Sequence, residues 1–101
     1  MNRFMMQQAQ KLQAQLLKAQ EELASLTVEA SSGGGAVKVT MNGQQQIQSV
    51  KISPDVLNKE DVQMLEDLVL TAVKEAQAAA QEAAAKKMGG LTGGLKIPGL
   101  T

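Results

Sequence analysis

Residues 33–43 read Gly-Gly-Gly-Ala-Val-Lys-Val-Thr-Met-Asn-Gly. The three glycines predict a flexible reversal of the chain, and the residues after them alternate between apolar and polar side chains. Because successive side chains of a strand point to opposite faces, we expect Val37, Val39 and Met41 to share a buried face. The closing Asn-Gly pair is the strongest short sequence signal for a tight hairpin turn. This stretch therefore predicts a strand between a glycine reversal and a hairpin.

Two more short strands flank this one. Residues 27–32 are compatible with β structure, and residues 45–52 alternate, with Val50 and Ile52 on one face. The other face of that strand would carry Ile47, Ser49 and Lys51. The Ser-Pro pair at 53–54 ends the sheet, since proline cannot donate to a ladder. We expect a three-stranded antiparallel meander, which needs a helix on one face for stability.

A long helix is predicted before the sheet. Residues 3–26 contain no Gly or Pro, and their apolar side chains recur at alternating spacings of four and three. This seam consists of Met5, Ala9, Leu12, Leu16, Ala19, Leu23 and Leu26. The helix would be about 36 Å long. It would therefore overhang a compact domain whose expected radius of gyration is about 13 Å.

A second helix is predicted over residues 59–87, with Asn58 as its N-cap and Glu60 and Asp61 in its first turn. Its apolar stripe consists of Val62, Leu65, Leu68, Val69, Ala72, Val73 and Ala76. The alanines after this stripe would keep the helix but bury little. Residues 88–101 are rich in glycine and are expected to lack fixed structure. We therefore predict one domain over residues 1–88 and a flexible tail over 89–101.

These elements predict an α+β fold: a long helix, a three-stranded antiparallel meander and a second long helix. Because both helices outreach the sheet, we predict a homodimer in which each protomer covers the other's helices. A monomer with frayed helix ends is the alternative. The residues expected in the core or the dimer interface are Leu12, Leu16, Leu23, Val37, Val39, Leu65, Leu68 and Val69.

The composition excludes most catalytic chemistry. The 101-residue chain has no His, Cys, Tyr or Trp, so it cannot hold a Ser-His-Asp triad, a cysteine nucleophile or an imidazole or thiolate metal site. Adjacent carboxylates on a helix point about 100° apart and do not converge on one site. We expect no enzyme activity, cofactor, metal or small-molecule substrate. No apolar run reaches the length of a membrane helix, so we expect no membrane partner and a cytoplasmic location.

The charged residues balance, with ten basic and ten acidic side chains. Bulk positive charge therefore cannot attract a polyanion, but a local stripe of cations can. Lys and Arg engage phosphates, and Gln can bond to phosphates or base edges. The candidate DNA-binding residues are Arg3, Gln7, Lys11, Lys18, Lys86 and Lys87. Solvated helix faces explain these residues equally well, although two-fold symmetry would favour contact with a duplex.

Several motifs together resemble the YbaB/EbfC family of bacterial nucleoid-associated proteins. They are the glycine reversal, Val-Lys-Val strand and Asn-Gly turn of residues 33–43, the Ile-Ser-Pro exit at 52–54 and the Met-Leu-Glu-Asp-Leu-Val run at 64–69. The Gln-rich opening helix also fits, and the resemblance covers nearly the whole chain. It implies a tweezer-like homodimer whose projecting helices bind DNA, with roles in nucleoid organisation and gene regulation.

Two functions are thus open. The first is a homodimeric binder of double-stranded DNA, with broad preference because Phe4 is the only aromatic wedge. The second is a structural module that grips a protein partner without binding DNA. The zero net charge, the leucine seam and the Gln-rich faces motivate this second function.

Overall fold

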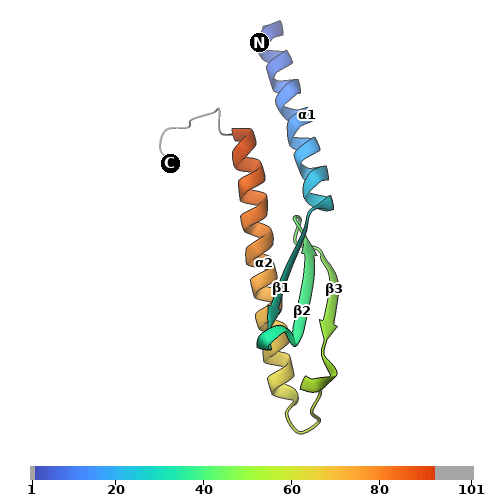
Figure 1. The fold of residues 1–101 in the computed structure, drawn as a ribbon. Coiled ribbons are helices and arrows are strands. Elements are labelled where there is room, and N and C mark those ends of the chain that lie inside the picture. The colour runs from blue at the N-terminus through green and yellow to red at the C-terminus, as the bar shows by residue number, and fades with distance from the viewer. Residues whose placement is uncertain (1, 93–101) are drawn as a thin grey trace, which may run out of the picture.

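The computed structural model, which describes residues 2–92, has two long helices and one small sheet (Figure 1). The elements follow the order α1 (Arg3–Ser25), β1 (Thr27–Ser32), η1 (Gly33–Gly35), β2 (Val37–Asn42), β3 (Ile47–Ile52), η2 (Pro54–Val56) and α2 (Val62–Thr92). The molecule is elongated, with extents of 69 × 27 × 17 Å. Its radius of gyration of 19.3 Å exceeds the value of about 13 Å expected for a compact domain of this length. The α+β class is confirmed.

The sheet is the predicted antiparallel meander, with the strand order β1-β2-β3. Val37, Val39 and Met41 of the central strand are fully buried, which confirms the predicted alternation. Val28 and Ala30 of β1 lie opposite Met41 and Val39 and pack against the same core. One face of the sheet therefore carries the core.

The start of β3 differs from the prediction. The strand begins at Ile47, and a register shift between Thr40 and Met41 pairs Met41 with Ile47. The sequence alternation had assigned Ile47 to the row of Ser49 instead. A bulge inserts an extra residue and so resets the two-residue period. Beyond it, Val50 pairs with Val39 of the core-facing row, as the alternation predicts.

Helix α2 packs on the sheet through small side chains. Ala72, Ala76 and Ala80 have no exposed surface, and four larger apolar residues of α2 pack beside them: Leu65, Leu68, Val69 and Val73. The expectation that the alanines after Ala76 bury little was therefore wrong for Ala80. Because alanine carries only a methyl group, the α2 backbone can approach the sheet closely. These positions are therefore buried without a long side chain.

The glycine segment is a defined turn that docks on α2. Gly33, Gly34 and Gly35 all have positive φ angles, which L side chains rarely adopt. A Cβ on Gly33 would also meet a methyl carbon of Leu68 at 2.9 Å. The hydroxyl of Ser32 donates to the Leu68 carbonyl at 2.6 Å. The expected flexible reversal is thus an ordered contact between the sheet and α2.

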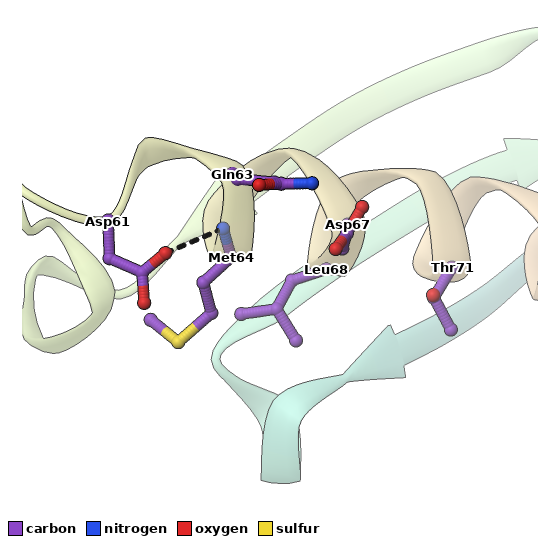
Figure 2. A pocket seen from close by; sticks show the side chains of 6 residues that line it. All are labelled: Asp61, Gln63, Met64, Asp67, Leu68 and Thr71. Atoms are coloured by element: carbon purple, nitrogen blue, oxygen red, sulfur yellow. Dashed lines mark hydrogen bonds between the residues drawn. The ribbon is translucent and has the colours of Figure 1, made fainter.

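Helix α2 starts later than predicted. Asn58 is not its N-cap, because its side chain accepts from Glu60 N, two residues on, within a local turn. Asp61 accepts from Met64 N at 3.2 Å instead, and Val62 is the first helical residue (Figure 2). Both Asn and Asp suit an N-cap, and Asp61 immediately precedes the periodic apolar residues, so its side chain meets the free N–H groups of the first turn.

The end of α2 also differs from the prediction. The helix extends to Thr92, so residues 88–92 of the expected unstructured tail are helical. Alanine and lysine are strong helix formers, and the helix they build continues through the two glycines at 89–90. The rest of the predicted tail, residues 93–101, lies outside the described residues.

The hairpin between β2 and β3 is not the two-residue turn predicted from Asn-Gly. The positive φ falls at Gln45 (64°), and neither Asn42 nor Gly43 has one. The buried Asn42 side chain holds a longer loop, because its Oδ1 accepts from Gln44 N and Gln46 N, both at 2.9 Å. Its Nδ2 also donates to the side chain of Gln46 at 2.8 Å. The asparagine stabilises the loop from within.

This same loop receives the C-terminal end of α1. Gly43 N donates to the carbonyls of Leu23 and Leu26 at 2.8 and 3.1 Å. The side chain of Gln44 donates to the Gln20 carbonyl at 3.0 Å. Ala19 and Leu23 are the buried residues of α1, and the described residues before Lys11 are exposed throughout. Helix α1 is therefore attached at one end only to the body of the molecule, which consists of the sheet and α2.

We predict that Gly43→Ala loosens this attachment. The new Cβ would lie 2.8 Å from the Leu23 carbonyl oxygen and 3.2 Å from its Cα, and both are backbone atoms that cannot move independently. Overpacking of this kind costs about 1–3 kcal/mol, which corresponds to a fall in Tm of roughly 4–8 °C per kcal/mol. Thermal melts followed by circular dichroism measure it.

The control is Gly89→Ala, where the added methyl group meets nothing within 4 Å. It should keep or raise Tm, since alanine favours a helix by about 1 kcal/mol over glycine. Equal Tm values for Gly43→Ala and the unchanged protein would contradict the close packing.

Candidate nucleic-acid interface

Helix α1 projects from the body and carries a row of cations. Figure 1 shows its N-terminal half extending past the end of α2. The side chains of Arg3, Lys11 and Lys18 are exposed and lie within about 80° of one another around the helix. Gln7 is exposed between them. Arg3 and Lys18 are about 22 Å apart along the axis, so the row can follow several phosphates of a duplex.

The leucine seam lies on the other side of α1 from this cation row. Leu12 and Leu16 are half-buried, and Leu23 is buried where the helix joins the body. The apolar seam therefore faces protein only toward the C-terminal end of α1, whereas Met5 and Ala9 near its start are exposed and the cationic side faces solvent.

Arg3, Lys11 and Lys18 make no ion pair with an acidic group of residues 2–92. Their charges are thus available to an external anion. We refer to Arg3, Lys11 and Lys18 as the α1 cation row.

The two lysines near the end of α2 are placed differently. Lys86 Nζ lies 3.4 Å from Glu82 of the same helix, in an exposed pair. Lys87 forms an ion pair with Glu22 of α1. The sequence prediction grouped both lysines with the α1 cation row, but the structure gives each a carboxylate partner. The sequence analysis did not identify Glu22 as the partner of Lys87, because no sequence spacing relates it to a lysine 65 positions later.

The Glu22–Lys87 pair affects the ionisation of the carboxylate. A hydrogen bond from the Lys87 ammonium lowers the pKa of Glu22 below its ordinary value, and the charges of Lys87 and Lys18 act in the same direction. Since the folded-state pKa is the lower one, the pair stabilises the fold above the unfolded pKa and ceases to do so as the pH falls through the folded pKa. The Glu22 carboxylate is therefore ionised at neutral pH.

An uncovered apolar groove lies on the opposite part of the molecule, between α2 and β3. It has a volume of about 470 Å³ and is lined by Ile52, Leu65, Glu66, Val69, Leu70 and Val73. Leu70 is 52% exposed and Ile52 39% exposed. Of the predicted core residues, Val37 and Val39 are fully buried, whereas Leu65 and Val69 are half-buried at this groove.

A second pocket shows no catalytic arrangement. Asp61, Gln63, Met64, Asp67, Leu68 and Thr71 line it (Figure 2). Asp61 is engaged in capping α2, and Met64 and Leu68 extend from the same side of the helix (Figure 2). Residues 2–92 contain no group of three or more His, Cys, Asp or Glu placed to hold a metal ion. Over the same part of the chain, no helix combines the length and apolarity that a bilayer crossing requires.

Comparison with known proteins agrees with the fold and identifies the family. A "Nucleoid-associated protein" of Pelotomaculum thermopropionicum is 54% identical over 96 residues, covering 95% of this chain and 91% of that protein. Another of the same name from Chloroflexus aurantiacus is 51% identical over 94 residues, covering 93% and 94%. An uncharacterized Helicobacter pylori protein has the same fold, with a TM-score of 0.79 at 18% identity over 90% of this chain and 97% of that one. Residues 1–95 match the family described as the YbaB/EbfC DNA-binding family. This protein belongs to the YbaB/EbfC DNA-binding family.

Proposed function

We propose that this protein binds double-stranded DNA as a homodimer with broad sequence preference, and so contributes to nucleoid organisation and gene regulation. The observation that carries the proposal is the α1 cation row, which projects from the body without acidic partners among residues 2–92. The names of the relatives, nucleoid-associated proteins, support a location on the bacterial chromosome in the cytoplasm.

The mechanism is local neutralisation of phosphates. Because the net charge is zero, attraction to DNA must come from where the cations stand rather than from their number. Arg3, Lys11 and Lys18 would displace condensed counterions from the phosphates they meet, which favours binding at low salt. With the row engaged on phosphates, the neighbouring Gln7 is left to contact base edges, so shape and deformability of the duplex would govern preference.

The proposal of a homodimer is based on the groove between α2 and β3. Helix α2 lies over β1 and β2, and the core-facing side of β3 keeps Val50 and Ile52 at 44% and 39% exposure. Contiguous apolar surface of this kind marks an association site. A second copy would cover the same groove on both protomers under two-fold symmetry, and it would also double the cation row.

Exposed apolar residues on α1 favour the second candidate function, a module that grips a protein partner. Phe4, Met5 and Met6 are 66%, 56% and 50% exposed at the projecting end of α1. Aromatic and methionine side chains are enriched in protein interfaces. This function would leave duplex DNA unbound even at low salt.

The DNA proposal predicts a charge-specific loss of binding. If the dimer engages about four to six phosphates, log K should fall with log salt at a slope of about −4 to −5. The triple variant Arg3→Gln, Lys11→Gln and Lys18→Gln should lose most of this slope and of the low-salt affinity. Fluorescence anisotropy with random and defined duplexes across a salt series measures both quantities.

The matched control changes three exposed lysines of the body, Lys38→Gln, Lys51→Gln and Lys59→Gln, and so removes the same charge. It should retain the slope. Equal losses in the two triple variants would refute the α1 cation row as the DNA contact.

The dimer proposal predicts a different outcome for two exposed leucines. Leu70→Glu places a carboxylate in the groove, and because Leu70 is already 52% exposed, the protomer fold should persist. The unchanged protein should have twice the 10.7 kDa mass of the chain in light scattering, and this variant the mass of a single chain. Leu17→Glu, at a 57% exposed position on α1, is the control and should remain dimeric. A dimeric Leu70→Glu protein would exclude the groove as the interface.

A further inference from the structure

The two long helices are joined by one ion pair between their side chains, Glu22 of α1 with Lys87 of α2. Both side chains remain partly open to solvent, with 42% of Glu22 and 36% of Lys87 exposed. An external anion can therefore reach the ammonium of Lys87 by displacing the carboxylate. An exposed pair of this kind contributes little to stability, so its displacement is easy.

Glu22 also lies next to the end of the α1 cation row. Lys18 is one helical turn before Glu22, and its charge favours the ionised form of the carboxylate. The carboxylate is thus paired with a cation of the other helix and has a second cation one turn away on its own helix. Without it, Lys18 and Lys87 would present two positive charges to the same region, an arrangement that suits a phosphate oxygen as well as a carboxylate oxygen.

We propose that Lys18 and Lys87 form a phosphodiester-binding site that Glu22 fills in the free protein. This inference rests on the proposed function and deepens it. A duplex lying along the α1 cation row meets the free charges of Arg3 and Lys11 first. It next meets Lys18, and it competes with the Glu22 carboxylate for Lys87, which extends the contact from α1 onto the end of α2. Glu22 is accordingly a negative determinant of affinity.

The test compares Glu22→Gln with Glu21→Gln. The two substitutions have the same size and remove the same charge at adjacent positions, but Glu21 makes no ion pair with residues 2–92. Duplex binding is measured by anisotropy across a salt series for both variants and the unchanged protein. We expect Glu22→Gln to tighten binding about fivefold or more relative to Glu21→Gln. We also expect its salt slope to steepen by about 0.9 for each phosphate gained.

A double-mutant cycle assigns the gain to Lys87. Lys87→Gln should weaken binding less when Glu22 is present than in the Glu22→Gln background, because the carboxylate competes with the duplex for the lysine. In the Glu22→Gln background the same change should remove the gain in affinity and in slope. Thermal melts of each variant by circular dichroism establish that the fold is kept.

Three results would overturn the inference. Equal affinities for Glu22→Gln and Glu21→Gln would mean that only the overall charge matters. Weaker binding by Glu22→Gln would mean that the ion pair positions α1 for DNA rather than competing with it. If neither the unchanged protein nor any variant binds duplex at low salt, the proposed function fails and this inference fails with it; the first two results leave the proposed function standing.

Discussion

The orientation of the projecting helix depends on the hydrogen bonds between the end of α1 and the loop after β2. The last carbonyls of a helix have no partner within it, and here Asn42, Gly43 and Gln44 supply donors to this end of α1. Asn42 can do so because its side chain is buried and also bonds the loop to itself. These hydrogen bonds hold the loop where it meets the helix. This attachment therefore sets the direction of α1 and of the side chains along it.

The body that supports this attachment has a small core. Three side chains of β2 and three alanines of α2 are fully buried, and most of the larger apolar residues around them remain partly open. Alanine brings the helix close to the sheet but covers little area, which leaves the β3 side of the sheet bare. A single chain thus builds a scaffold long enough to project a helix, at the expense of covering its own apolar surface.

Sequence patterns predicted most of the fold and less of the site. The alternation around Val39 and the heptad spacing of α1 were both predicted from periodicity. The alternation appears in the structure, whereas the heptad seam is buried at Ala19 and Leu23 but exposed at Met5. The prediction of a two-residue hairpin turn was wrong, because the Asn42 side chain bonds within a longer loop. Gly43 allows close approach to Leu23 and does not have a positive φ. The partner of Lys87 was invisible for another reason: an ion pair between helices depends on how they pack, and no local spacing encodes that.

The attachment of α1 through a later loop has a consequence for biosynthesis. Residues 3–25 leave the ribosome before residues 42–44, which carry the groups that hold them. Helices in proteins are stabilised mainly by tertiary packing, so α1 has no fixed direction until the hairpin closes on it. The nascent chain must complete β2 and β3 before α1 takes up a fixed position.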